Sequence, residues 1–159
     1  MKSSHRGSKF ETPCRSKCAI SLTLELLGDR WTLLVIRDML IFQKKRYQDF
    51  LESPEKISTN ILADRLFRLQ KLGIITKSGD PDNKKQFIYA PTAKGIDLLP
   101  ILFDLARWGI KHDRRTDLKH PLVSRFVSDE EQWSKEIWAV FKKPKHPRLK
   151  QKCPKRSKP

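Results

Sequence analysis

Long apolar segments are absent from this 159-residue chain. No stretch approaches the roughly 18 consecutive apolar residues that a membrane-spanning helix requires, and residues 1–13 lack the apolar centre of a secretory signal. Cysteine is also scarce. The chain has three cysteines, Cys14, Cys18 and Cys153, and this small, odd number does not suit a disulfide framework. We therefore expect a soluble, cytoplasmic protein that is stabilised by an apolar core rather than by disulfides.

Patterns of catalytic and metal-ligating residues are missing as well. No nucleophile, glycine-rich phosphate loop or carboxylate pair has the spacing that catalysis requires. Cys14 and Cys18 lie four residues apart, but no second His or Cys pair follows at the spacing of a zinc site. The four histidines are scattered over predicted tails and connectors: His5, His112, His120 and His146. We expect no enzyme activity, no cofactor and no bound metal.

Positive charge is what the chain has in excess. It carries 34 Lys and Arg residues against 18 Asp and Glu residues, a formal net charge of +16. Residues 1–17 contain five basic residues and one acidic residue, and residues 142–159 contain nine basic residues and no acidic one. The middle of the chain is therefore nearly balanced. We expect both tails to be disordered and to contact polyanions, nucleic acid first and an anionic membrane surface second.

Apolar periodicity predicts a largely helical domain with one hairpin. Gly28 ends the first helix, Asp29 caps the second, Ser58 caps the fourth and Gly73 ends it, and Thr92 caps the fifth. Helices are expected at 19–27, 30–40, 47–51, 58–72, 92–108 with a kink at Pro100, and 128–141, where Ser128 to Glu131 forms a capping box; strands are expected at 74–77 and 86–90, and an unpatterned connector at 111–127.

The order of these elements is that of a winged helix-turn-helix. The helix that begins after Ser58 would be the DNA recognition helix, and residues 47–51 would form the helix that supports it. The loop 78–85 would be the wing. Such a helix buries one stripe and presents polar groups to the major groove, whereas a wing carries cations toward phosphates or the minor groove. The expected fold class is mainly α, with a two-stranded wing and extra helices for dimerisation.

The predicted recognition helix has one polar face. If Leu62 and Leu66 mark its buried stripe, the residues on the far side are Asn60, Asp64, Phe67, Arg68 and Lys71. Asn60 can pair with adenine through two hydrogen bonds, and Ser58 and Thr59 can reach phosphates. Arg65 falls near the buried edge, so an internal ion pair and a phosphate contact are both open to it. The full set of predicted DNA contacts is Ser58, Thr59, Asn60, Arg65, Arg68, Lys71, Lys84, Lys85 and Arg46, the last within a basic cluster at 44–46.

Several stretches together resemble the HxlR-type family of bacterial transcriptional regulators. The resemblance extends from about Cys18 to Gly109. It rests on Cys18, Leu24 to Leu34, Arg46 to Phe50, Ile57-Ser58, Leu62, Arg65-Leu66, Leu69, Leu72 to Ile75, Tyr89, Thr92, Gly95, Leu98 to Pro100 and Trp108-Gly109. Cys14, the helix at 128–141 and the basic tail lie outside the family pattern.

The resemblance implies a homodimeric winged helix-turn-helix that binds a palindromic operator and represses or activates nearby genes. It places dimer contacts on the first helix and the long apolar helix, which agrees with apolar surface that one small domain cannot cover. The implied interface residues are Ile20, Leu24, Leu98, Leu102, Leu105 and Trp108. Some members sense oxidants or electrophiles through the cysteine that corresponds to Cys18, although a packing role for this thiol is equally open.

We therefore predict a transcriptional repressor or activator that acts as a homodimer on double-stranded DNA, with no membrane partner. The predicted organisation is an arm at 1–17, a DNA-binding domain at 18–110, a connector and helix at 111–141, and a tail at 142–159. An oxidant effector, or a small aromatic molecule held between the long helices, remains a hypothesis. The alternative is a winged-helix adaptor or a nonspecific nucleic-acid-binding protein that recognises no operator.

Overall fold

The computed structural model describes residues 17–141, so most of the predicted arm and the whole predicted tail, with Cys14 and Cys153, lie outside the described residues. The described elements are α1 (Ala19–Leu27), α2 (Arg30–Leu40), α3 (Tyr47–Leu51), α4 (Thr59–Lys71), β1 (Ile75–Gly79), β2 (Phe87–Pro91), α5 (Ala93–Ile96), α6 (Leu99–His112) and α7 (Pro121–Phe141). The fold is mainly helical with a two-stranded antiparallel sheet, as the sequence predicts. None of the helices in this range is long and apolar enough to span a membrane.

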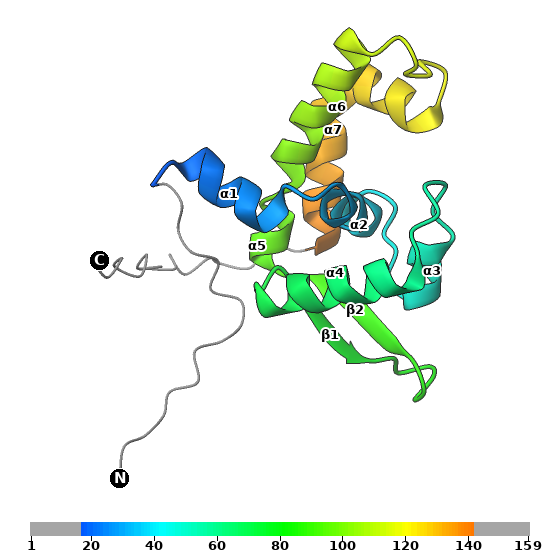
Figure 1. The fold of residues 1–159 in the computed structure, drawn as a ribbon. Helices are drawn as coiled ribbons and strands as arrows, with labels where there is room; N and C mark the ends of the chain where they lie inside the picture. The colour runs from blue at the N-terminus through cyan, green and yellow to red at the C-terminus, as the bar shows by residue number, and fades with distance from the viewer. Residues whose placement is uncertain (1–16, 142–159) are drawn as a thin grey trace, which may run out of the picture.

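The elements are arranged around α2. Figure 1 shows α4 lying over the sheet, α6 rising away from it with α7 alongside, and α1 extending away from the rest of the domain. Helix α2 contacts α1, α4, α6 and β2, and its Val35, Ile36, Met39 and Leu40 are among the most deeply buried side chains. The broad apolar surface that the sequence gives this helix is therefore covered on several sides, as a central core helix requires.

Helix starts follow the capping residues that the sequence predicts. The Asp29 carboxylate accepts a hydrogen bond from the Thr32 backbone N–H (3.0 Å), and the Ser58 hydroxyl accepts one from the Ile61 N–H (3.4 Å). Thr92 does the same for Gly95 at the start of α5 (3.3 Å). Each cap satisfies a backbone donor that has no partner within the first helical turn.

Gly73 ends α4 because the chain there adopts a left-handed conformation. Its φ of +66° strains any residue with a Cβ atom, and it allows a Schellman motif to form. The Gly73 N–H donates to the carbonyl of Gln70 and the Ile74 N–H to that of Leu69, both at 3.0 Å. The chain thus turns directly from the end of α4 into the sheet.

The hairpin pairs Ile75 with Pro91 at its base and Gly79 with Phe87 near the wing. Both strands are shifted toward the C-terminus of the chain from the predicted ranges 74–77 and 86–90. Residues 45–46 lie beside β2, since the Tyr89 N–H donates to the Lys45 carbonyl (2.8 Å) and Arg46 forms an isolated bridge with Ile88. The segment before α3 therefore fixes the edge of the wing.

Two predictions for the second half of the chain are wrong. The continuous kinked helix predicted at 92–108 is two helices, α5 and α6, because Pro100 lies in the first turn of a new helix, where its missing N–H costs nothing. The connector predicted at 111–127 is only partly irregular, since α7 begins at Pro121. Helix α7 departs from helical dihedrals at Asp129, and that side chain, rather than Ser128, caps the second half by accepting from the Gln132 N–H (3.0 Å).

Aromatic side chains join α7 to α6. The Phe103 ring of α6 lies 5.3 Å from the Phe126 ring and 5.5 Å from the Trp133 ring, measured between centroids. An ion pair between Arg107 and Glu130 (2.6 Å) bridges the same two helices. Through these contacts α7 packs against α6 and contributes to the apolar core.

Close approach between α5 and the start of the sheet predicts the effect of one glycine substitution. A Cβ atom on Gly95 would lie 2.3 Å from the Ile74 backbone oxygen, whereas one on Gly79 would meet nothing within 4 Å. We expect Gly95→Ala to lower the free energy of unfolding by about 1–3 kcal/mol through overpacking. Gly79→Ala, the matched control, should change it by no more than about 0.5–1 kcal/mol. Urea unfolding followed by circular dichroism measures both, and equal stability of the two variants would contradict the packing described.

Candidate nucleic-acid interface

The first turn of α4 is exposed and polar. Ser58, Thr59 and Asn60 all face solvent, and the Tyr47 hydroxyl of α3 donates a hydrogen bond to the Thr59 carbonyl (2.7 Å). This bond ties the two helices of the helix-turn-helix together at the end where a recognition helix approaches base edges. The structure therefore places these three predicted residues on one accessible turn.

Only part of the predicted polar face of α4 is available beyond that turn. Lys71 and Phe67 are exposed, with the Lys71 ammonium 5.4 Å from the centre of the Phe67 ring. Arg68 instead turns toward α1, where its guanidinium donates to the Glu25 carbonyl (2.6 Å). The prediction that Arg68 points outward is wrong, because the projecting α1 covers that flank of the helix.

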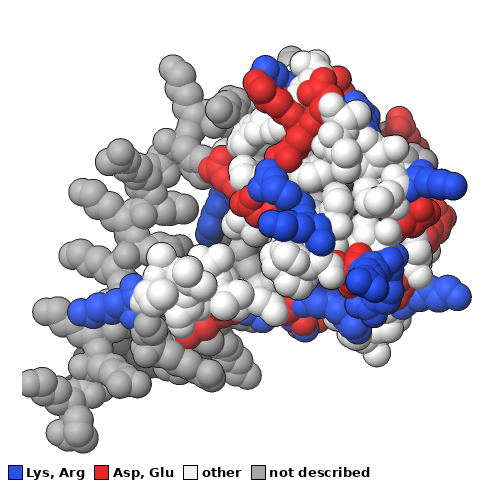
Figure 2. Space-filling model, turned by 90° about the horizontal axis from the view of Figure 1, so that it is seen from above, with Lys and Arg blue, Asp and Glu red and all other residues white. Residues whose placement is uncertain are grey.

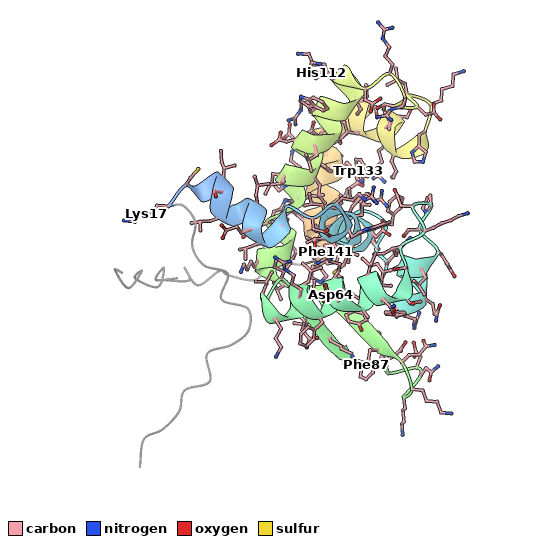
Figure 3. All side chains as sticks on the ribbon, viewed as in Figure 1. Lys17, Asp64, Phe87, His112, Trp133 and Phe141 are labelled. Carbon is pink, nitrogen blue, oxygen red and sulfur yellow. The ribbon has the colours of Figure 1, made fainter. Side chains whose placement is uncertain are left out.

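Arg65 takes the internal alternative that the sequence left open. Its guanidinium lies 2.9 Å from the Asp29 carboxylate before α2 and 3.2 Å from the Asp64 carboxylate. The neighbouring Asp64, labelled on α4 in Figure 3, is thereby paired with Arg65. The Arg65–Asp29 pair joins α4 to the start of α2, and it engages the guanidinium in an internal contact.

The wing carries Lys84 and Lys85 at its exposed tip. Its base is closed by the buried carboxylate of Asp80, which lies 2.6 Å from Nε of Arg46 and accepts a hydrogen bond from the Asp82 N–H (2.9 Å). The Arg46 hydrogen bond and then the Asp82 N–H hold the pKa of Asp80 below its usual range. Arg46 therefore orients the wing, a role that the sequence did not predict for it.

The basic cluster at 44–46 is divided among three different environments. Lys44 points inward to the Asp38 carboxylate (3.2 Å) and the Ser53 hydroxyl (2.6 Å), and Arg46 is committed to Asp80. Lys45 is exposed. Within residues 17–141, Lys45 is therefore the member of the cluster whose exposed charge forms no ion pair, whereas the Arg46 side chain is 43% exposed but bound to Asp80.

The structure adds an aromatic contact on the wing that the sequence analysis missed. Phe87 is 51% exposed, and the Lys77 ammonium lies 3.8 Å from the centre of its ring. The two residues lie on adjacent strands near the wing, where Figure 3 labels Phe87. Alternation along the strands assigns Lys77 and Phe87 to the same face as the buried Ile75 and Tyr89. It therefore predicts core positions for both side chains and offers no signal for this exposed contact.

Helix α3 and the wing face one another. A hollow of about 210 Å³ between α3 and the wing is lined by Arg46, Tyr47, Gln48, Lys85, Gln86, Phe87 and Tyr89. Figure 1 shows the wing tip at the same end of the domain as α3. The side seen from above in Figure 2 carries acidic and basic side chains intermixed, so it lacks the single sign of charge that favours a polyanion.

Most of the apolar residues predicted at a dimer interface are exposed. Ile20 and Leu24 on α1 are 72% and 61% exposed, Leu105 and Trp108 on α6 are 52% and 66% exposed, and Leu98 is half-buried. Leu102 is the exception, because it is only 8% exposed inside the single chain. Its assignment to the dimer interface is therefore wrong.

Cys18 occupies the N-cap position of α1 and is exposed. Hydrogen bonds from the backbone N–H groups of Ser21 and then Ile20 lower the pKa of its thiol. A thiolate at a helix N-terminus is favoured by these donors and by the helix dipole. Over residues 17–141 no three His, Cys, Asp or Glu side chains come together as a metal site would require.

The helix pair α3–α4 followed by a two-stranded wing defines a winged helix-turn-helix protein. The model of the HxlR-like helix-turn-helix family matches residues 26–117, and the chain belongs to this family. It is a transcriptional regulator of the winged-helix type, and the relatives found are described as transcriptional regulators rather than enzymes.

Known relatives match part of the chain. The HTH-type transcriptional regulator YodB of Bacillus subtilis is 32% identical over 83 residues, which cover 52% of this chain and 73% of YodB. Its reduced form superposes with a TM-score of 0.51 at 26% identity, over 64% of this chain and 100% of that one.

Two further solved structures share the fold. PA1607 gives a TM-score of 0.60 at 28% identity, over 67% of this chain and 73% of that one. The redox regulator HypR in its oxidised form gives 0.53 at 26% identity, over 59% of this chain and 96% of that one.

The Arg46–Asp80 pair predicts a pH dependence of stability. Because the pKa of Asp80 is lower in the folded state than the roughly 3.9 of an unfolded aspartate, its carboxylate stabilises the fold above that pH. This contribution is lost as the pH falls through the folded pKa. We expect Asp80→Asn to be less stable than wild type at pH 6, and the difference to shrink at pH 3, in urea unfolding.

The matched control for this experiment is Asp82→Asn. Asp82 is largely exposed, and its carboxylate lies 3.7 Å from the Arg46 guanidinium. We expect that variant to follow the wild-type curve at both pH values. A stability difference for Asp80→Asn that stays constant from pH 6 to pH 3 would show that the ion pair is not the cause.

Proposed function

We propose that this protein binds a palindromic operator in double-stranded DNA as a homodimer and thereby controls transcription of adjacent genes. The observation that carries the proposal is the exposed polar turn of Ser58, Thr59 and Asn60 beside a lysine-tipped wing. Two such turns would enter successive major grooves about 34 Å apart. The proposed function is binding alone and involves no chemical reaction on the DNA.

The residues of this surface divide into base-reading and phosphate-binding groups. Asn60 has the amide that pairs with the N6 and N7 edge of adenine, and Ser58 and Thr59 present hydroxyls at a helix N-terminus, where phosphates bind. Lys84, Lys85 and Lys71 present charge without a planar hydrogen-bonding edge, which suits the DNA backbone. Asn60 therefore carries most of the sequence preference in this proposal.

Replacing Asn60 with alanine should weaken specific binding by roughly 5- to 150-fold, since one bidentate base contact contributes about 1–3 kcal/mol of discrimination. Binding to scrambled DNA should change little, because phosphate contacts are retained. Fluorescence anisotropy with labelled duplexes of both kinds measures the two affinities.

A matched double variant, Lys84→Gln with Lys85→Gln, provides the control. It should weaken specific and scrambled binding alike and reduce the slope of log affinity against log salt by about two. An equal loss on both duplexes for Asn60→Ala would contradict its base-reading role.

Exposed apolar side chains on α1 and α6 support the homodimer. Ile20, Leu24, Leu105 and Trp108 would lose contact with water if a second copy packed on them, a gain of about 25 cal/mol for each Å² of apolar surface buried. A dimer of this kind has twofold symmetry, and its operator is correspondingly palindromic. The proposed surface excludes Leu102.

A charge on this surface should separate the two copies. We expect Leu24→Glu to shift the protein from dimer to monomer in sedimentation equilibrium, and to weaken binding to a palindrome at least about tenfold because one half-site is lost. Leu118→Glu, which makes the same change at an exposed leucine outside α1 and α6, should remain dimeric. Persistence of the Leu24→Glu dimer would place the interface elsewhere.

Cys18 supports a second candidate function, the sensing of oxidants or electrophiles. Its exposure, its lowered pKa and its position next to the proposed dimer surface favour a reactive thiolate, and HypR is described as a redox regulator. In the proposed reaction with a quinone, the thiolate sulfur adds to a ring carbon and the ring oxygen takes up a proton. The added group would stand at the start of α1 and disturb dimer packing.

The thiol of Cys18 should titrate below the roughly 8.5 of an ordinary cysteine. A Cys14→Ser, Cys153→Ser variant leaves Cys18 as its single thiol, and the rate of its alkylation by iodoacetamide against pH gives the value. Quinone treatment should lower DNA affinity in this variant and not in Cys18→Ser. A midpoint at or above 8.5, or an equal response of both proteins, would end the sensor proposal.

A further inference from the structure

An apolar cavity of about 490 Å³ lies between α2, α6 and α7. Its volume falls within the range of about 300–1,000 Å³ that small-molecule sites occupy. Leu34 of α2 and Ala106 of α6 form part of its walls, and Phe126 and Trp133 of α7 line it as well. Figure 3 shows Trp133 between α6 and α7. Because most of its lining is apolar, the cavity favours an apolar ligand over a polar one.

Helix α7, which forms one wall of the cavity, lies beyond the residues that the family model matches. The residues matched by the family model end at 117, whereas α7 spans Pro121–Phe141. The Phe126 and Trp133 rings are held against Phe103, and the Arg107–Glu130 ion pair fastens the same helix from outside. The cavity thus includes a helix beyond the matched residues, and its surface is already supported without a ligand.

The charged side chains that line the cavity are all positive. Two side chains of its lining are charged, Arg30 and Arg37, and none is acidic. Arg37 is paired with the carboxylates of Asp38 and Glu55, both at 2.6 Å. Arg30 is exposed, and its guanidinium stacks 4.8 Å from the Trp31 ring centre, a contact that leaves its donors accessible. Arg30 is therefore placed to bind an anionic group at the rim.

We propose that this cavity binds an aromatic organic acid, with the rings between α2, α6 and α7 and the carboxylate on Arg30. Rings suit the Phe126 and Trp133 surfaces, since aromatic pairs favour offset and edge contacts. A guanidinium binds a carboxylate through two parallel hydrogen bonds. The apolar cavity thus selects the aromatic rings of the ligand, and Arg30 at its edge selects the carboxylate.

The cavity and the recognition helix share α2. Arg30 directly follows Asp29, which caps α2 and pairs with Arg65 of α4 at 2.9 Å. A carboxylate on Arg30 would add negative charge near this pair, and rings against Leu34 would press on the helix that supports α4. An effect of the ligand on DNA rests on the proposed function, whereas binding of the ligand does not.

The test uses the full chain without DNA and isothermal titration with 2-naphthoate, a two-ring carboxylate. The neutral probe 2-naphthylmethanol has the same rings and no charge. We expect naphthoate to bind at least about tenfold more tightly than the alcohol, as a charged hydrogen bond predicts. Arg30→Gln should abolish this preference, and Arg114→Gln, which removes an exposed arginine outside the cavity, should retain it.

Ala106→Phe tests the location of the site by filling the chamber from α6. It should weaken binding of both probes, and the exposed Arg30→Gln variant keeps the proposal testable if Ala106→Phe fails to fold. Equal affinity of the two probes, or naphthoate binding unchanged by both substitutions, would overturn the proposal.

A second copy of the chain is the competing occupant, because Leu105 both lines the cavity and is exposed. In that case naphthoate would bind more weakly as the protein concentration increases and would dissociate the dimer in sedimentation equilibrium, which would also overturn the proposal. Binding that is independent of protein concentration supports it. Loss of DNA binding alone affects only the proposed function.

Discussion

The packing of α4 against α2 is the contact on which the rest of the structure depends. Leu62, Leu66 and Leu69 of α4 lie in the same apolar cluster as Val35 and Met39 of α2, and all five are almost fully buried. Because α2 also contacts α1, α6 and β2, it fixes the recognition helix relative to these three elements. Close-packed protein interiors have low compressibility and transmit strain, so a displacement of α2 is passed on to α4.

Ion pairs beside this core determine which basic residues remain for DNA. The Asp38 carboxylate is buried and accepts hydrogen bonds from Arg37, Lys44 and Ser53, so these groups cannot leave it without exposing an unpaired buried charge. Asp80 holds Arg46 in the same way at the wing. The positive charge available to a polyanion is therefore smaller and more localised than the composition suggests.

The local chemistry of the chain was predictable from sequence. Asp29, Ser58 and Thr92 cap their helices as expected, because a cap depends on residues only three positions apart. Leu102 and Arg68 were not predictable in this way. A helical wheel separates a buried stripe from its opposite face, but it does not reveal that α1 covers the flank of α4 that carries Arg68.

The second half of the chain shows the same limit at a larger scale. Leu122, Val123 and Phe126 carry an apolar pattern for the start of α7, but they fall in a stretch whose other residues resemble a connector. The cavity requires three helices that are distant in sequence, and no local pattern encodes such a space. The position of Arg30 and Arg37 at this cavity was likewise not predictable from sequence, because both lie on α2, whose apolar pattern indicates only a core helix.

The central claim is that the α4 turn and the wing recognise a specific operator as a dimer. Selection of bound duplexes from a random library by the full chain tests it most directly, followed by a salt titration of the selected sequence against scrambled DNA. The account predicts a palindromic consensus with half-sites about one helical turn apart and a preference of roughly 4–10 kcal/mol over scrambled DNA. Failure to select a consensus, with affinity that depends on salt concentration alone, would contradict it and favour a nonspecific nucleic-acid-binding or adaptor protein.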